Sequence, residues 1–367
     1  MVVGAVVFVL TSLLSFAAGI RASLAASGHP RNLVVLAPGA TAESMSIILP
    51  DQGNRLVQTP GVARSAAGHL MMSMDVCVQT SIPRNNSDRT PANVAVRGVD
   101  ETAFDIHPEV RIVEGLRFEP AAREVIVGKA ARNRYTDLHV GTEIALGKQK
   151  NRHFRVVGVF ESGGSALESE IWGPRTVISD AYGRRFVSSS IVKLADGAST
   201  EEAIAYINGP AVNLEAKTET RYYHELAAKT REIVLLATIL ITIMAIGAAF
   251  AVANTMYAAV DGRRREIAML RTIGFGRGAI ILALLGESLL ICIPACGAAL
   301  GCSLLLDGVK QDFLSDTTWT VLAYELKITP STVATALGVA VFVGLAGAMA
   351  PAVNAARTRI IEALRKA

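Results

Sequence analysis

The side chains best suited to chemistry in this 367-residue sequence gather in one basic segment. Residues 261–278 hold five arginines and two acids, and Ile267, Leu270 and Ile273 recur at the spacing of one helix face. A short amphipathic helix of this kind fits a groove in a soluble partner protein. The alternative is a helix that lies on the membrane surface, with its arginines on anionic lipid headgroups.

The signatures of the common enzyme classes are absent from the sequence. Residues 141–148 come closest to a phosphate-binding P-loop, but one residue too many separates the two glycines, and Gln149 stands where Ser or Thr is required. Their alternation instead predicts a strand and a turn. The six histidines form no His-Glu-x-x-His zinc motif, and no Gly-x-Ser-x-Gly elbow occurs. We therefore expect a non-catalytic chain that binds no metal and no cofactor of its own.

Four long apolar segments separate these polar regions. They cover residues 2–20, 233–260, 279–306 and 328–356, and Glu287 is their only charged residue. About 20 helical residues span a hydrocarbon core of ~30 Å, and a helix pairs its own backbone amides in lipid. Buried helices of a soluble enzyme are the alternative, which four such segments disfavour. For the first segment a cleaved signal peptide is a second alternative, but no basic residue precedes it, and we expect an uncleaved anchor.

The placement of basic residues predicts the orientation of these helices. The composition is 51% hydrophobic and 19% charged with a net charge of +4, and arginines are concentrated in residues 261–278 and in the tail from Arg357. The connection 307–330 instead holds two lysines against four acids. The positive-inside rule places the basic loop and the tail in the cytoplasm and residues 21–231 outside. The net charge is therefore a topological signal, and we expect no nucleic-acid partner.

The exported segment has the pattern of a soluble mixed domain. Helices are predicted at residues 129–138 and 200–207, the second opening on a capping box from Ser199 to Glu202, and residues 81–91 are predicted to form a polar loop. Short β-type runs separated by turn residues lie at 32–36, 124–127, 143–146, 153–160 and 190–194. The predicted fold class is an α-helical membrane protein with four transmembrane helices and a large mixed α/β extracytoplasmic domain inserted between helices 1 and 2.

The predicted organisation follows the chain from end to end. It comprises transmembrane helix 1 (1–21), an extracytoplasmic α/β domain (22–217), a stalk helix (218–232) that continues transmembrane helix 2 (233–260) outward, a cytoplasmic loop (261–278), transmembrane helix 3 (279–306), an extracytoplasmic loop (307–327), transmembrane helix 4 (328–356) and a cytoplasmic tail (357–367).

Two features within the apolar segments invite a functional interpretation. Glu287 is an intramembrane acid, and such acids often serve in transport. It lies only ten residues after Arg277, however, where it can reach water or a basic partner. Gly297 and Gly301 form a Gly-x-x-x-Gly pattern that lets helices approach closely, either within one subunit or between two.

Several of these stretches together resemble one family. Residues 265–274 (Arg-Glu-Ile-Ala-Met-Leu-Arg-Thr-Ile-Gly) and residues 344–356, with Glu-Ala-Leu-Arg at 362–365, are similar to the FtsX/MacB/LolC-type ABC transporter permeases. Residues 94–100, 124–131 and 137–146 look like the MacB-like periplasmic domain of that family. Such permeases usually carry a basic amphipathic segment before the first helix, so this chain is expected either to lack it or to start further upstream.

The resemblance implies a permease subunit of the bacterial inner (cytoplasmic) membrane that works as a homodimer or paralogue heterodimer. A separate ABC ATPase would bind ATP and Mg, and the loop helix would be the coupling helix that the ATPase moves. The residues so implicated are Arg263, Arg265, Glu266, Ile267, Leu270, Arg271, Ile273 and Gly274, and those implicated in helix packing, besides Gly297 and Gly301, are Gly344, Gly347 and Pro351.

The family also implies what the movement of the coupling helix does. Transmitted across the membrane, this movement would drive export or extraction of a hydrophobic substrate such as a lipid, lipoprotein, peptide or amphipathic drug. The alternative is an FtsX-like regulator that activates a periplasmic cell-wall hydrolase without transport. Membrane lipids and a periplasmic membrane-fusion adaptor are further expected partners.

Overall fold

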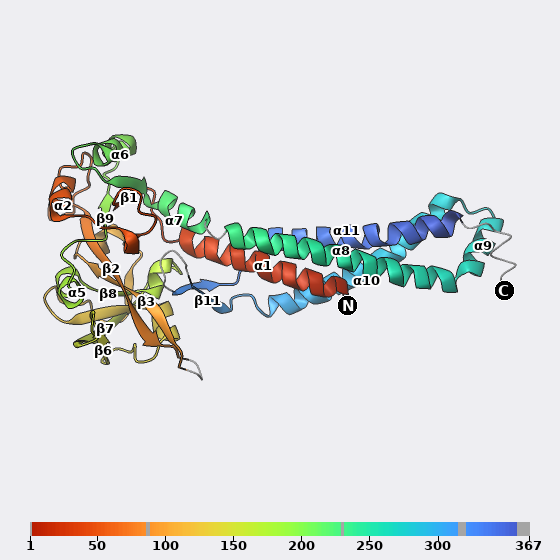
Figure 1. Cartoon of the computed structure of the whole chain (residues 1–367), viewed down its shortest axis with the longest axis horizontal. Coiled ribbons are helices and arrows are strands. Elements are labelled where there is room, and N and C mark those ends of the chain that lie inside the picture. Colours follow the sequence, from red (N-terminus) through yellow and green to blue (C-terminus); the bar gives the residue numbers. More distant parts are fainter. Residues whose placement is uncertain (1, 86–88, 229–230, 315–320, 358–367) are drawn as a thin grey trace. The chain divides into compact units, whose positions relative to one another are not determined.

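The chain folds into two compact units in a computed structural model that describes residues 2–85, 89–228, 231–314 and 321–357. One unit comprises residues 1–19, 230–309 and 325–367 and holds the long apolar helices. The other comprises residues 20–229 and 310–324 and holds a sheet domain. The elements of both units are labelled in Figure 1.

Four helices of the described chain are long and apolar enough to cross a membrane, as predicted (Figure 1). They are α1 (Val2–Ala25), α8 (Arg231–Gly262), α10 (Arg277–Leu304) and α11 (Pro330–Arg357). Val3, Val6 and Val7 of α1 are buried in one core with Ala336 and Ala340 of α11. Helix α1 therefore packs with the helical unit through its first part, and its retention as an uncleaved anchor stays a prediction.

Small residues let α11 approach its neighbours closely. A Cβ added at Gly347 would lie 2.6 Å from the carbonyl oxygen of Ala249 on α8, and a Cβ at Gly344 would lie 3.0 Å from the sulfur of Cys292 on α10. The Ser288 hydroxyl donates to the Gly344 carbonyl oxygen over 2.9 Å. In lipid, close packing and interhelical hydrogen bonds of this kind hold helices together, since burial from water contributes little.

The other predicted packing positions differ from these two. Pro351 is buried inside α11, where neighbouring helices make a proline tolerable. A Cβ at Gly297 or Gly301 would meet no atom within 4 Å. Of the two uses considered for the Gly-x-x-x-Gly pattern, close contact within one subunit is therefore not observed in the described chain.

A ten-stranded mixed sheet forms the centre of the exported unit and confirms its α/β class. The strand order is β10-β1-β9-β2-β3-β8-β5-β7-β4, with β6 paired to β7; β3 with β8 and β5 with β7 are parallel pairs. The strands are β1 (Asn32–Leu36), β2 (Met72–Pro83), β3 (Pro91–Val99), β4 (Arg111–Gly115), β5 (Glu124–Gly128), β6 (Glu143–Leu146), β7 (Arg152–Glu161), β8 (Ile171–Pro174), β9 (Ser189–Lys193) and β10 (Glu215–Thr218).

Helical elements connect these strands. The α-helices are α2 (Pro50–Leu56), α3 (Ala103–Ile106), α4 (Lys129–Arg134), α5 (Arg175–Tyr182), α6 (Thr200–Asn208) and α7 (Glu219–Ala228), and the 3-10 helices are η1 (Glu43–Met45) and η2 (Ala166–Ser169).

Strand β2 joins the two halves of the sheet. Its residues up to Asp75 pair with β9, and its residues from Val76 onward pair with β3. Each half has its own hydrophobic core, because each packs its helices on a separate stretch of sheet. Leu33, Leu56, Val192 and Ile207 belong to the core of the first half, and Val96, Tyr135, Phe154 and Ile171 belong to that of the second.

Most of the predicted local elements are confirmed. All five predicted β-type runs occur, as β1, β5, β6, β7 and β9, to within one residue at either end. Helix α6 begins at the predicted cap, where the Ser199 hydroxyl accepts a hydrogen bond from the Glu202 amide over 3.2 Å. The segment that resembles a P-loop is strand β6 followed by Gly147, whose φ of +97° makes the turn.

Two local predictions are wrong. The predicted loop at 81–91 is shorter, because β2 and β3 continue as a hairpin to the pair Pro83 and Pro91; residues 86–88 lie outside the described structure. The helix predicted at 129–138 ends at Arg134. Tyr135 leaves the helix because its ring is buried and its hydroxyl donates to the Asn93 carbonyl oxygen over 2.8 Å.

The boundaries around the exported unit also differ from those predicted. Helix α7, the outer part of the predicted stalk, belongs to the exported unit, and residues 229–230 before α8 lie outside the described structure. The predicted loop 307–327 contains a two-stranded sheet of β11 (Lys310–Leu314) and β12 (Val321–Glu325), with residues 315–320 outside the description. The predicted tail is described only at Arg357.

Replacing Gly347 by alanine should destabilise the helical unit, because the new methyl group would overlap the Ala249 carbonyl. Overpacking of this kind costs about 1–3 kcal/mol and should lower the thermal unfolding midpoint of the chain in detergent. Gly338→Ala is the matched control, since it lies in the same helix and its Cβ would meet no atom within 4 Å. Equal midpoints for the two variants would contradict the close approach of α8 and α11.

Candidate functional site

The basic loop forms a separate short helix, α9 (Arg264–Thr272), between α8 and α10. Arg263 leaves the helical conformation with φ −112°, which separates α9 from α8, and Gly274 ends the turn after α9 with φ +111°, a conformation that glycine adopts readily. Glu266 lies in the first turn and Arg271 in the last, and both charges suit the helix dipole. The short helix predicted within residues 261–278 is therefore observed as α9.

One side of α9 packs on the helical unit. Ala268 is buried, and Ile267 packs against a core that includes Val260 of α8, Ile280 of α10 and Ala352 of α11. The contact fixes α9 to a core that three long helices share. A displacement of α9 must therefore move the ends of those helices or break this packing.

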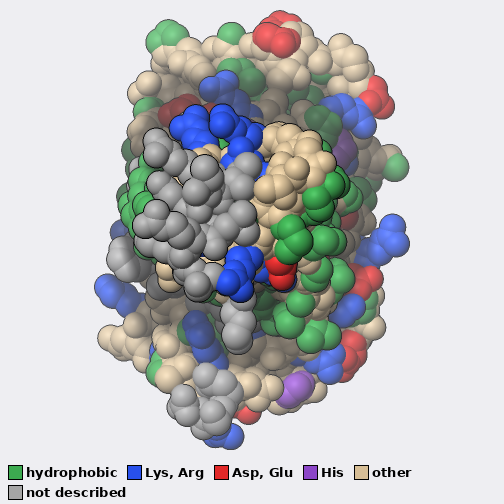
Figure 2. Space-filling view, turned by 90° about the vertical axis from the view of Figure 1, so that its right-hand side faces the viewer, with side chains coloured by type: hydrophobic (Ala, Val, Ile, Leu, Met, Phe, Trp, Pro, Cys, Tyr) green, Lys and Arg blue, Asp and Glu red, His purple; other side chains and the backbone are tan. Residues whose placement is uncertain are grey.

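The other side of α9 and the turn after it expose large hydrophobic side chains to solvent. Leu270 and Ile273 lie on this side, whereas Ile267, predicted to share their face, lies on the packed side. The exposed fraction is 56% for Met269, 43% for Leu270, 72% for Ile273 and 54% for Phe275. In the space-filling view toward this end, hydrophobic side chains gather beside basic and acidic groups (Figure 2). Contiguous exposed apolar groups rimmed by charge mark interaction surfaces. Arg265 and Glu266 are exposed on the same helix.

Two ion pairs tie the loop to its surroundings. The Arg263 guanidinium lies 2.8 Å from a carboxylate oxygen of Glu287 on α10, and Arg264 pairs with Asp261. Glu287 therefore pairs with a basic residue, which is one of the two possibilities expected from its position near the loop. The predicted coupling residues and Glu287 are thus brought together at one end of the helical unit, whereas Gly297 and Gly301 lie further along α10.

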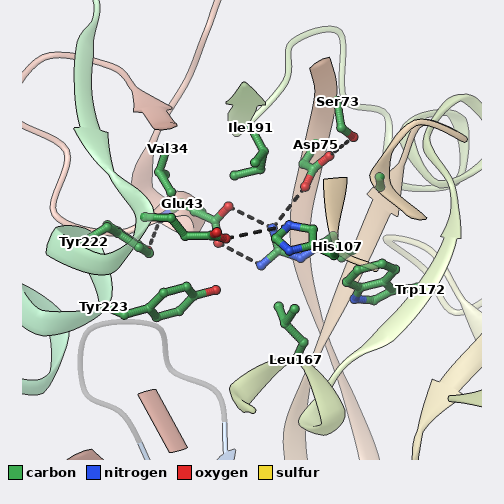
Figure 3. Close-up of a pocket in the computed structure, with 13 residues that line it drawn as sticks. Val34, Glu43, Ser73, Asp75, His107, Leu167, Trp172, Ile191, Tyr222 and Tyr223 are labelled. Carbon is green, nitrogen blue, oxygen red and sulfur yellow. Dashed lines mark hydrogen bonds and ion pairs between the residues drawn. The ribbon is translucent and has the colours of Figure 1, made fainter. Parts of the chain in front are cut away.

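A second polar cluster, which the sequence did not reveal, lies inside the exported domain. Arg97 of β3 is only 6% exposed and bonds three carboxylates, with N–O distances of 2.7 Å to Glu43, 3.2 Å to Asp75 and 2.7 Å to Glu170. Glu43 belongs to the first half of the sheet domain, Glu170 to the second, and Asp75 lies where β2 changes partner. Figure 3 shows Glu43 and Asp75 converging there.

The carboxylates around Arg97 respond to burial in different ways. Burial raises the pKa of Asp75 to about 6, although the Arg97 charge and the Ser73 hydroxyl oppose the shift. Burial also favours a higher pKa for Glu43, but the charge and hydrogen bonds of Arg97 outweigh burial and lower the pKa of that carboxyl. Glu43 therefore supplies the firm ion pair, and Asp75 holds a proton in mildly acidic solution.

No local pattern in the sequence announces this cluster. Arg97 is the one charged residue of strand β3, and its partners lie 54, 22 and 73 residues away along the chain. A charged residue in such a strand is the one available signal, because a buried charge requires partners. Among the described residues, no group of three or more His, Cys, Asp or Glu side chains is placed to hold a metal ion.

Comparison with known proteins finds relatives over both units. Residues 1–209 match the family model described as MacB-like periplasmic core domain, and residues 238–360 match the one described as FtsX-like permease C-terminal. The chain is 28% identical over 306 residues to the macrolide export ATP-binding/permease protein MacB 1/2 of Paracoccus denitrificans, covering 76% of this chain and 42% of that protein. It is 25% identical over 289 residues to the macrolide export ATP-binding/permease protein MacB of Chromobacterium violaceum, covering 75% and 44%.

The chain thus spans less than half the length of these relatives. Among solved structures, the periplasmic region of MacB from Actinobacillus actinomycetemcomitans is similar with a TM-score of 0.39 and 11% identity. That similarity covers 53% of this chain and 92% of the solved one.

Arg97→Gln should destabilise the exported domain, because it leaves three carboxylates buried without their common cation. Breaking a buried ion pair costs about 3–5 kcal/mol, which thermal unfolding followed by circular dichroism would detect. Arg155→Gln is the matched control, since Arg155 is 61% exposed in its pair with Glu124 and such pairs contribute about 1 kcal/mol or less. An Arg97 variant as stable as the Arg155 variant would show that the cluster does not hold the two halves together.

Proposed function

Because this chain belongs to the FtsX/MacB-type ABC transporter permeases, we propose that it is the permease subunit that couples ATP hydrolysis by an ABC ATPase subunit to conformational change in its periplasmic domain. It is a multi-pass membrane protein with a periplasmic domain. In the proposal it resides in the bacterial inner membrane, with α9 in the cytoplasm and the ATPase bound there, and the chain itself is non-catalytic.

The exposed apolar side of α9 is the observation that carries this proposal. Leu270 and Ile273 present apolar surface to solvent between two membrane-type helices, and arginines flank them. A groove on the ATPase would bury these side chains, and carboxylates at its rim would pair with the arginines. The segment lies within the part of the chain that matches the FtsX-like permease model.

The packing of α9 supports transmission as well as docking. Ile267 and Ala268 fix the helix to a core shared by α8, α10 and α11, so a push on α9 acts on all three. A close-packed core responds by shifting helices rather than by compressing. Helix α8 is continuous from Arg231 to Gly262, which suits a rigid lever for mechanotransmission.

A dimer of permease subunits completes the proposed assembly. Gly297 and Gly301 leave open space on α10, which a helix of a second subunit, either identical or a paralogue, could approach closely. Exposed large side chains along α8, including Leu236 and Phe250, leave further apolar surface for lipid or for that subunit. A periplasmic membrane-fusion adaptor is a further proposed partner.

The proposed substrate is hydrophobic: a lipid, a lipoprotein, a peptide or an amphipathic drug. Two of the relatives carry macrolide export in their names, and a macrolide belongs to the last of these classes. Export is therefore the function we propose in preference to regulation of a cell-wall hydrolase.

Leu270→Glu should abolish productive contact with the ATPase, because it buries a carboxylate in the docking groove and places it among like charges at the rim. We expect co-purification of the ATPase and its stimulated ATP hydrolysis to fall at least about tenfold, which corresponds to ~1.4 kcal/mol of binding free energy. Leu116→Glu makes the same chemical change at a position of the exported domain that is 75% exposed, and serves as the control.

Equal recovery of the ATPase with both variants, at equal expression in the membrane, would overturn the coupling role of α9. Unchanged ATPase binding, together with a lower thermal stability of the Leu270→Glu chain in lipid vesicles, would instead assign α9 to the lipid surface.

A further inference from the structure

Helix α7 is attached to the exported domain through a buried acid at its first residue. Glu219 is only 1% exposed and accepts hydrogen bonds from the His29 amide over 3.0 Å and from the Asn32 side chain over 2.9 Å. A Cβ at Gly28 would lie 2.8 Å from the Cα of Thr220. The segment that follows α1 and the start of α7, which precedes α8 in the chain, are thus held against each other inside the exported domain.

A buried histidine faces the second oxygen of that acid. The Nδ1 atom of His107 lies 3.0 Å from a carboxylate oxygen of Glu109, and its Nε2 atom lies 3.7 Å from Glu219 Oε1. The latter distance is too long for a direct hydrogen bond. The two groups therefore interact through their charges, and the interaction depends on how many protons His107 and Glu219 carry between them.

A small cavity with room for about one water molecule lies between this pair and the Arg97 cluster. The Tyr223 hydroxyl of α7 points into the cavity in Figure 3, which also shows His107 and Asp75 on its wall. The neighbouring Tyr222 hydroxyl accepts a hydrogen bond from the Glu43 amide over 3.3 Å. Helix α7 thus contacts both polar groups, through Glu219 on one side and Tyr222 on the other.

Acids outnumber bases in this buried region. Burying an unpaired charge is costly, so a surplus carboxylate either takes up a proton or weakens the packing around it. Asp75 is faced by Arg97 of β3, Glu43 of η1 and Ser73 of β2, and Glu170 lies on the other side of Arg97. His107 is faced by Glu109, Glu219 of α7, Asp75 and His29. Lys193 of β9 and Arg31 lie beside His29.

We propose that this cluster is a proton-operated latch, in which protons shared by Asp75, His107 and Glu219 hold α7 against the exported domain and their release loosens it. The latch belongs to the exported domain alone and is independent of the coupling role proposed for α9.

The direction of the pH effect follows from the three groups. Burial raises the pKa of Asp75 to about 6 and raises the pKa of Glu219, while the carboxylates of Glu219 and Glu109 overcome the effect of burial on His107 and raise the pKa of its imidazole. Each group binds its proton more tightly in the folded state, so each contributes stability that is lost as the pH rises through its folded-state pKa. The attachment of α7 should therefore be tighter at pH 5.5 than at pH 8.

Hydrogen exchange of the full chain in lipid nanodiscs tests the latch. The local opening equilibrium of residues 220–227, corrected for intrinsic exchange and referred to helix α6, should rise about tenfold between pH 5.5 and pH 8, the factor that a tenfold difference in proton affinity produces. Glu219→Gln should weaken this dependence, because the amide cannot release a proton. Glu225→Gln removes an acid from the exposed part of the same helix, where it pairs with Lys217 and Arg221, and should leave the dependence intact.

A wild-type opening equilibrium that does not change with pH overturns the latch. So does a pH dependence that Glu219→Gln and Glu225→Gln leave equally intact. If Glu219→Gln fails to fold, His107→Gln replaces it, because the neutral amide removes the imidazole charge while Glu219 keeps its backbone and Asn32 partners, and the same loss of pH dependence is expected.

Discussion

Hydrocarbon offers no partner to an unpaired backbone amide, and this constraint governs the whole arrangement of the chain. It requires α1, α8, α10 and α11 to pair their own backbones as continuous helices, and it leaves their contacts to small residues and a few shared hydrogen bonds. Gly347 and Gly344 provide such contacts on α11. Polar chemistry is thereby confined to the connections between these helices, in α9 and in the sheet domain that follows α1 in the chain.

Charge has opposite uses in the two units. In α9 Arg264 and Arg265 remain exposed near apolar side chains, which suits a surface that a partner covers. In the exported domain Arg97 is buried and binds carboxylates from both halves of the sheet at the point where β2 changes partner. The first arrangement can bind and release, whereas the second fixes two halves of a domain and responds to pH through its surplus acids.

The sequence was sufficient wherever a local rule determines structure. Length and absence of charge identified the membrane-type helices, and alternation with turn residues identified five strands to within one residue. Prediction from the sequence failed where contacts join residues that are far apart in the chain. Nothing near Arg97 predicts Glu170, and Tyr135 ends a helix because of a hydrogen bond to a strand 42 residues earlier. The role of Gly297 likewise depends on a neighbour that the local pattern does not specify.

Helix α9 is, in our proposal, the surface at which an ATPase acts on this chain. A photo-crosslinking amino acid at Ile273, which is 72% exposed, tests it most directly, with the same residue at Leu116 of the exported domain as reference. Illumination of intact cells should link the ATPase to position 273 and not to position 116. Crosslinks from position 273 to lipid alone, or to periplasmic proteins, would contradict it.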